Sequence, residues 1–225
     1  MRVVTYNVRG FRDGRHRVVA VVNSLQADVV LLQETGSRRA LRRFASDVGM
    51  RAARDPWSPF QRRVKNAVLL AAPWRSISIE LVRFGRATHW YPRGALVVRA
   101  ATDEHTLCAL SVHFGLDGAE RGRQAGALQR LVAALNCDVV VAGGDLNATP
   151  DMQAPTRIAA ELSDAWAEAG TGDGATFPAS APAVRIDYVF VADGPDITRA
   201  VVGGDGASEA SDHLPVAIDL VIGTV

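Results

Sequence analysis

The sequence predicts an α/β fold in which two β-sheets pack face to face and helices cover them. Short apolar runs rich in β-branched residues recur along the whole chain, giving about ten strands against about four amphipathic helices. Both βα units and consecutive strands occur in this order of elements. Of the 225 residues, 48% are hydrophobic, which suffices for a substantial core, and no linker or repeat marks a boundary. We therefore expect one domain over residues 1–225.

The first half of the chain alternates strands and helices. Residues 3–8 and 29–32 are apolar runs typical of strands. Residues 15–25 carry valine and leucine at positions i, i+3, i+4 and i+7, which predicts a helix, and residues 38–48 also have an apolar helical face. Further strands are expected over residues 66–72, 77–82 and 94–100.

The second half begins with a strand predicted over residues 106–113, followed by the clearest helix of the sequence over residues 119–136. A buried strand over residues 138–142 is expected to end in Gly143–Gly144. A shorter helical region lies within residues 152–169. The closing strands are predicted over residues 186–191, 197–202 and 215–221.

The charge of the chain is nearly balanced. A net charge of +1 excludes a strong basic field of the kind that marks many nucleic-acid-binding proteins. Arginines do cluster over residues 38–43 and 51–63, and a solvated helix face explains such clusters as well as a binding surface does. We expect Cys108 and Cys137 to be buried free thiols, although a disulfide between them stays open.

Targeting and membrane signals are missing from the pattern. The longest apolar runs fall far short of a membrane span, and Met1 leads directly into the first predicted strand. From these absences we expect a cytoplasmic monomer without integral membrane association.

Polar side chains that can bind a cation lie at the ends of the apolar runs. Asn7 lies near the end of the first predicted strand, Glu34 follows the second, and His113 closes a later one. Strand ends of a packed scaffold commonly display catalytic groups. Oxygen ligands and histidines without a cysteine cluster suit a hard cation such as Mg²⁺ and phosphate-ester chemistry. Simpler roles stay open, namely a turn at Asn7, a helix N-terminus at Glu34 and a buried imidazole at His113.

Asp145 and Asn147 follow the buried run Val139–Val141. If the backbone stays extended, their side chains point to the same side, because side chains alternate along a strand. A carboxylate there can orient or deprotonate water, and a carboxamide can donate to a phosphoryl oxygen. A turn explains the same Gly-Asp-Leu-Asn segment equally well.

The segment Ser211–Asp212–His213 places an acid beside a histidine. Neighbouring side chains face apart on a strand, so we expect Asp212 to face a metal and His213 to be oriented by another carboxylate. Asp187 on an earlier strand is the natural candidate. A histidine held in this way can perform acid–base work or stabilise developing negative charge, whereas a structural loop histidine is the simpler alternative.

Together and in this order, these segments resemble the endonuclease/exonuclease/phosphatase superfamily of metal-dependent phosphoesterases. The resemblance spans essentially the whole chain, and its elements are Asn7, Gln33–Glu34, His113, Gly144–Asn147, Arg185–Tyr188 and Ser211–His213. It implies a four-layer αββα sandwich, in which two mostly antiparallel sheets are flanked by helices and the site lies at one rim.

The resemblance also implies a role for each matching residue. Glu34 would hold Mg²⁺ or Mn²⁺ with Asn7 and Asp212 close to it, and Asp145 would orient or activate the attacking water. The metal would neutralise charge on the phosphate as a Lewis acid.

The remaining matches would act on the phosphate itself. Asn147 and Arg93 would contact it, and His213, paired with Asp187, would stabilise the transition-state charge. His113 would protonate the leaving oxygen or bind a phosphoryl oxygen. Pancreatic-type deoxyribonucleases of the superfamily pair this histidine with a carboxylate on a neighbouring strand, and the matching strand here, residues 66–70, has no acid.

The sequence therefore predicts a Mg²⁺- or Mn²⁺-dependent phosphoesterase, with a phosphodiester as the expected substrate. A nuclease acting on DNA or RNA is the alternative, and a non-catalytic binding module on the same fold is a third hypothesis. Aromatic residues lie among arginines and could stack bases near the site or serve as core or loop anchors; they are Trp57, Phe60, Trp90 and Tyr91.

Overall fold

The first of two β-sheets contains the N-terminal strand and the last described strand. A computed structural model describes residues 1–85 and 91–223. In the order of the sheet, its strands are β11 (Asp196–Val202), β12 (Val216–Val221), β1 (Arg2–Asn7), β2 (Val29–Gln33), β4 (Ala67–Leu70) and β3 (Arg51–Arg54). Strands β1 and β2 are parallel, and the other neighbours in this sheet are antiparallel.

The second sheet repeats this plan with the middle of the chain. Its strands are, in order, β5 (Arg75–Arg83), β6 (Gly94–Ala101), β7 (Thr106–His113), β8 (Val139–Asp145), β10 (Asp187–Val191) and β9 (Ser163–Asp164). Here β7 and β8 are parallel, and the other neighbours are antiparallel. The prediction of two mostly antiparallel sheets is therefore confirmed.

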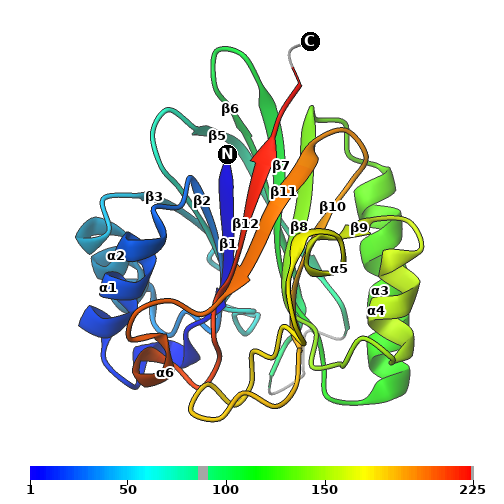
Figure 1. Cartoon of the computed structure of the whole chain (residues 1–225). Coiled ribbons are helices and arrows are strands. Elements are labelled where there is room, and N and C mark those ends of the chain that lie inside the picture. Colours follow the sequence, from blue (N-terminus) through cyan, green and yellow to red (C-terminus); the bar gives the residue numbers. More distant parts are fainter. Residues whose placement is uncertain (86–90, 224–225) are drawn as a thin grey trace.

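Helices cover the outer face of each sheet (Figure 1). The first sheet is covered by α1 (Arg15–Leu25), α2 (Arg38–Asp47) and the short α6 (Ala207–Ala210). The second is covered by α3 (Gly118–Ala133) and α4 (Gln153–Ala159), and the remaining helices are η1 (Arg9–Phe11) and α5 (Ala165–Ala169). Among residues 1–85 and 91–223, none of the helices combines the length and hydrophobicity that crossing a lipid bilayer requires. The four-layer αββα sandwich is confirmed.

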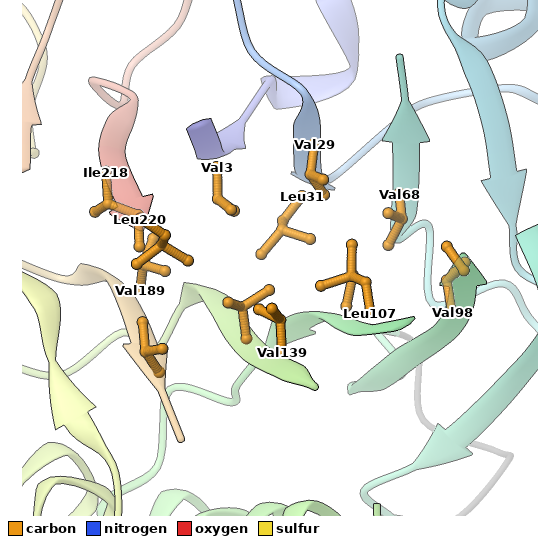
Figure 2. Close-up of a cluster of buried hydrophobic side chains, with 14 of the residues drawn as sticks. Val3, Val29, Leu31, Val68, Val98, Leu107, Val139, Val189, Ile218 and Leu220 are labelled. Atoms are coloured by element: carbon orange, nitrogen blue, oxygen red, sulfur yellow. The ribbon is translucent and has the colours of Figure 1, made fainter. Parts of the chain in front are cut away.

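The central core lies between the two sheets. Figure 2 shows side chains of the first sheet, such as Leu31 and Val68, facing Leu107 and Val139 of the second. Adjacent residues of the same strands point outward to the helices, because side chains alternate along a strand. Both faces of the central strands are thus buried, which explains why they read as continuous apolar runs.

The strand directions gather polar ends at one rim, the lower one in Figure 1. Asn7 lies opposite Gln33 at the ends of the parallel pair β1 and β2. His113 lies opposite Asp145 at the ends of the parallel pair β7 and β8. Strand β10 is antiparallel to β8 and begins at this rim, with Asp187 opposite Asp145. Parallel strands end together and antiparallel neighbours begin there, so distant segments meet.

Several element boundaries differ from the sequence predictions. Strand β8 does not end at Gly143–Gly144 but continues to Asp145. Gly144 allows this continuation because it has no side chain. A Cβ at this position would overlap the carbonyl oxygen of Val112 in the neighbouring strand β7. The helical region within residues 152–169 is two helices, α4 and α5. Strand β3 was not predicted because Arg51–Arg54 has no apolar alternation, although it pairs with β4.

The prediction that the two cysteines are free thiols is wrong, because Cys108 and Cys137 form a disulfide. Cys108 lies in β7 opposite Val140, and Cys137 lies just before β8, the parallel neighbour of β7. Their Cα atoms are 5.8 Å apart despite a sequence separation of 29. A crossover between parallel strands brings them together, and the sequence does not display this proximity.

We predict that Leu31→Ala destabilises the protein by about 2–5 kcal/mol, because the side chain is fully buried between the sheets. Urea unfolding at equilibrium measures this change. Leu116→Ala is the matched control, since Leu116 is 73% exposed and its truncation should change the free energy of unfolding by less than about 0.5 kcal/mol. Equal stability of the two variants would contradict the packing between the sheets.

Candidate active site

The carboxylate of Asp145 is the centre of a buried polar cluster at the rim. Its Oδ2 accepts a hydrogen bond of 3.0 Å from Nδ2 of Asn7. The Nε2 atoms of His113 and His213 lie 3.3 Å and 3.8 Å from the same oxygen. These four residues come from both sheets and are nearly inaccessible to solvent. The structure therefore joins predicted site residues that lie up to 206 positions apart, from Asn7 to His213.

His213 is oriented by Asp187, in the pairing that the sequence predicts. Nδ1 of His213 lies 2.8 Å from Oδ2 of Asp187. The hydroxyl of Thr176 donates a hydrogen bond of 2.6 Å to the same carboxylate oxygen. The ring of Phe177 packs 5.0 Å from the His213 ring, measured between centroids. The imidazole is thus fixed on two sides, with Nε2 directed toward Asp145.

An extended backbone would place Asn147 on the same strand face as Asp145, but the structure does not have this arrangement. Strand β8 ends at Asp145, and Asn147 has a left-handed backbone with φ of 49°. Its backbone N–H donates to Oδ1 of Asp145 at 2.9 Å, and its Nδ2 donates to the Phe114 carbonyl at 3.0 Å. The segment is therefore a tight turn that also holds the carboxylate, so both sequence interpretations apply to it.

Glu34 and Arg93 line one open cavity with His113, beside the buried cluster. The cavity has a volume of about 470 Å³. Glu34 has φ of 53°, and its carbonyl accepts a hydrogen bond of 2.7 Å from the Gly10 amide. A non-glycine residue in this region of backbone space is strained, and such strain concentrates at functional sites.

Asp212 and Glu34 line different cavities. The carboxylate of Asp212 pairs with Nε of Arg9 at 3.1 Å and lines a separate cavity with Asp13. The backbone N–H of Arg9 also donates to Oδ1 of Asn7 at 3.1 Å. Arg9 therefore stands between two of the residues predicted as metal ligands and contacts both.

His113 has no carboxylate partner on β4, as the sequence indicates. Its partners are Asp145 on the adjacent strand β8 and Arg93, whose Nη1 lies 2.9 Å from Nδ1 and 2.7 Å from Nε2 of the imidazole. Burial lowers the pKa of Arg93, while the charges of Asp145 and Glu34 oppose that effect. Arg93 thus adds a positive charge to the edge of the cluster.

The pKa values of the two buried carboxylates are shifted in opposite directions. Burial alone would raise the pKa of Asp145, but the hydrogen bond from His113 and the charges of His113 and His213 outweigh it and lower the pKa to about 2. Burial raises the pKa of Asp187 in spite of the opposing charge of His213. Burial would lower the pKa of His213, yet Asp187 raises it to about 9 through charge and hydrogen bonding. At neutral pH Asp145 is ionised and the His213–Asp187 pair holds a proton.

A second set of buried polar residues lies between the two sheets next to the cluster. Nε2 of Gln33 donates to Oγ of Ser111 at 3.1 Å, and this hydroxyl donates to the Leu32 carbonyl at 2.7 Å, so the contacts cross between the sheets. Nδ2 of Asn66 donates to the Ser111 carbonyl at 2.8 Å. Sequence reasoning missed the supporting roles of Asn66 and Thr176. The position of Asn66, a polar residue at the start of a predicted strand, could have indicated its role. Thr176 lies in a Gly/Ala-rich loop, and no sequence pattern indicates its role.

Three buried groups of the cluster could hold a metal ion. Asp145, Asp187 and His213 each offer a ligand atom, and these atoms all lie within 4.8 Å of one another. Of the predicted ligands, Asn7 belongs to the cluster, Glu34 lines the adjacent cavity and Asp212 pairs with Arg9. The chemical roles of all the predicted site residues stay predictions.

The chain belongs to the endonuclease/exonuclease/phosphatase family, whose model matches residues 4–213. Members of this family hydrolyse phosphoester bonds. A comparison with curated proteins finds no match.

Solved structures with the same fold cover the chain almost completely. An endonuclease/exonuclease/phosphatase from Bacteroides vulgatus has a TM-score of 0.84 and 16% identity, over 99% of this chain and 98% of that one. A humanized TDP2 from D. rerio has a TM-score of 0.78 and 18% identity, over 98% of each chain. A mannosyl-6-phosphatase from Bacteroides thetaiotaomicron has a TM-score of 0.78 and 16% identity, over 99% of this chain and 100% of that one. At these identities the likeness shows the fold.

We predict that Asp187→Asn lowers the pKa of His213 from about 9 by at least about one unit, because the variant removes the nearest negative charge. NMR titration of the imidazole in metal-free protein measures this pKa. Wild-type His213 stabilises the fold below its unfolded pKa of about 6.5, and this contribution is lost as the pH rises through its folded pKa. An unchanged pKa in the variant would show that Asp187 does not control His213.

Proposed function

We propose that the protein is a divalent-metal-dependent phosphoesterase that cleaves a phosphodiester by direct attack of water. Membership of a family of phosphoester hydrolases supports the reaction class. The observation that carries the proposal is the buried Asp145 carboxylate, which contacts Asn7, His113 and His213 from both sheets. Buried titratable groups with shifted pKa values beside an open cavity are typical of catalytic sites, and Asp145 and His213 both have shifted pKa values.

The residues at the rim fit Mg²⁺ or Mn²⁺ through their donor chemistry. Glu34 supplies a carboxylate in an open cavity, and Asn7 supplies an amide oxygen that accepts a hydrogen bond from the N–H of Arg9, which lines the same cavity. Asp212 would have to exchange its ion pair with Arg9 for a metal contact. We propose Glu34 as the principal ligand, with Asn7 next to it and Asp145 within reach. Such an ion supplies Lewis-acid neutralisation of phosphate charge.

Asp145 positions the attacking water in this mechanism. Its pKa of about 2 makes it a carboxylate at neutral pH and a weak base, so orientation of the nucleophile through a hydrogen bond is its main contribution. The contacts from Asn7 and the Asn147 amide fix the direction of its oxygens. Restraining the nucleophile in line with phosphorus reduces the entropic part of the barrier.

His213 and its neighbours bind the developing charge. The His213–Asp187 pair holds a proton at neutral pH, so Nε2 can donate to a phosphoryl oxygen. Nδ2 of Asn147 has a second hydrogen for the same purpose, and Arg93 beside His113 supplies a positive charge. His113 lies next to both Asp145 and Arg93, where it can bind a phosphoryl or leaving oxygen.

We predict that Asp145→Ala and His213→Ala each lower kcat for bis-p-nitrophenyl phosphate by about 10²–10⁴-fold, since each removes a positioned catalytic group. Glu34→Gln should raise the Mg²⁺ or Mn²⁺ concentration required for half-maximal rate, and a chelator should abolish the reaction. Arg39→Gln on the exposed face of α2 is the control and should retain the wild-type rate. Full activity of both Asp145→Ala and His213→Ala would refute the mechanism.

A nuclease is a second candidate, favoured by exposed aromatic residues, one of which lines the cavity. Trp57, Phe60 and Tyr91 are 73%, 93% and 79% exposed, so they are not core anchors. Tyr91 lines the cavity that contains Glu34. Exposed aromatic rings beside arginines provide stacking surfaces for bases. Trp90 lies outside the described residues.

We predict that single-stranded DNA or RNA is a substrate and that Trp57→Ala with Phe60→Ala raises its KM by about tenfold or more through lost stacking. A panel of plasmid, single-stranded DNA, RNA, phospholipid and bis-p-nitrophenyl phosphate measures the effect. The loss on nucleic acid should exceed the loss on bis-p-nitrophenyl phosphate. Equal losses on all substrates, or no cleavage of nucleic acid, would exclude the nuclease.

The cytoplasmic location and the monomeric state stay predictions. The disulfide between Cys108 and Cys137 favours an oxidising compartment over the cytoplasm, because disulfides are rare in the reducing cytosol.

A further inference from the structure

The cavity beside the catalytic cluster is lined mainly by positively charged side chains, although the net charge of the chain is close to zero. The net charge of the protein is +1. Glu34 is the single carboxylate among the described residues that line this cavity of about 470 Å³. Six cationic side chains line it, namely Arg9, Arg12, Arg62, Arg63, Lys65 and Arg93. The charge around the cavity is therefore strongly positive, and a divalent cation on Glu34 would make it more so.

Three of these cations are engaged within the protein. Arg9 pairs with Asp212, and Nη1 of Arg93 contacts the ring of His113. Arg63 pairs with Asp55 at 2.7 Å. Arg9 and Arg63 are paired with carboxylates and Arg93 is held against His113, so these three build the wall of the cavity.

Arg12 and Lys65 differ from these three. Over residues 1–85 and 91–223, neither side chain lies within 4.0 Å of a carboxylate oxygen, and both residues are exposed. They come from segments far apart in the sequence, after η1 and before β4, yet line the same cavity. Two cations without an internal carboxylate partner, placed beside a phosphate-cleaving cluster, can bind an anion that arrives with the substrate.

Hydrogen bonds from Thr35 fix the backbone of Lys65 at the cavity. Its φ is 64°, in the left-handed region that a non-glycine residue rarely occupies. Its carbonyl accepts two hydrogen bonds from Thr35, 2.9 Å from the amide nitrogen and 3.0 Å from the hydroxyl. Arg9 and Glu34, which line the same cavity, also have positive φ values, of 45° and 53°. Strained backbone is thus clustered around this cavity.

We infer that Arg12 and Lys65 form a subsite for a second phosphate, so that the substrate carries another phosphate group beside the scissile one. This inference rests on the proposed function, because the scissile phosphate must lie near His113 and Asp145. Arginine binds phosphate through paired hydrogen bonds, and lysine adds a point charge. The second phosphate can belong to the next nucleotide of a strand or to a small bisphosphorylated ester.

Dithymidine phosphodiesters with and without a terminal 5′- or 3′-phosphate test the inference. Wild-type protein should cleave one phosphorylated form with a KM about tenfold or more below that of the unphosphorylated form, since a charged hydrogen bond contributes to binding on this scale. The Arg12→Gln/Lys65→Gln double variant should lose this preference. Added salt should weaken the preference in the wild type because it screens exposed charges.

Arg39→Gln is the matched control, because it removes an exposed arginine outside the cavity and should keep the preference. Circular dichroism and urea unfolding establish that the variants are folded. A double variant that retains the preference, or a wild type that hydrolyses bis-p-nitrophenyl phosphate but shows no preference, would overturn the subsite and leave the proposed function intact.

Calorimetric binding in the presence of a chelator tests the subsite without catalysis. Thymidine 3′,5′-bisphosphate should bind the wild type about tenfold more tightly than thymidine monophosphate, and the double variant should bind both equally. The same pair of measurements with a sugar bisphosphate and its monophosphate distinguishes a small organic substrate from a nucleotide one. If no substrate is hydrolysed with Mg²⁺ or Mn²⁺, the proposed function fails, and these affinities still decide the subsite. Equal affinities in the wild type for both pairs would contradict it.

Discussion

The hydrogen bond from Asn7 to Asp145 ties the two halves of this protein together at the site. Asn7 ends a strand of the first sheet and Asp145 ends a strand of the second. A buried carboxylate is expensive unless it is paired, so the Asp145 carboxylate, 2% exposed, requires donors from both sheets. His113 and His213 complete this shell. The sheets must therefore meet in one register, and the remaining site residues take their positions from that constraint.

The layout of the sheets explains why so few loops are required to build the site. Each sheet contains one parallel pair, β1 with β2 and β7 with β8, whose carboxyl ends reach the same rim. Apolar packing between Leu31 and the second sheet fixes the separation of these ends. Buried polar contacts from Gln33 and Ser111 then set their alignment. Core packing and catalytic geometry are thus consequences of the same strand pairing.

Charge in this protein is organised locally. The net charge is only +1, yet six cationic side chains line the cavity that contains Glu34. Arg9 and Arg63 are engaged by internal carboxylates, whereas Arg12 and Lys65 are left toward solvent. Composition averages over such differences, so it argued against a polyanionic substrate although the fold gathers positive charge at one place. The identity of the substrate depends on this local field.

The sequence by itself predicted most of the elements and several residues of the buried polar cluster. Periodicity placed α1 and β7 at their observed bounds, and strand-end polarity identified Asp145 and His213, because these features depend on near neighbours in the chain. Only the tertiary structure decided the Cys108–Cys137 disulfide and the cation-lined cavity, because both depend on which strands become neighbours. The turn at Asn147 likewise depends on contacts with Phe114, 33 residues away. Pairing across the sheets is a property of the folded chain, and no local pattern encodes it.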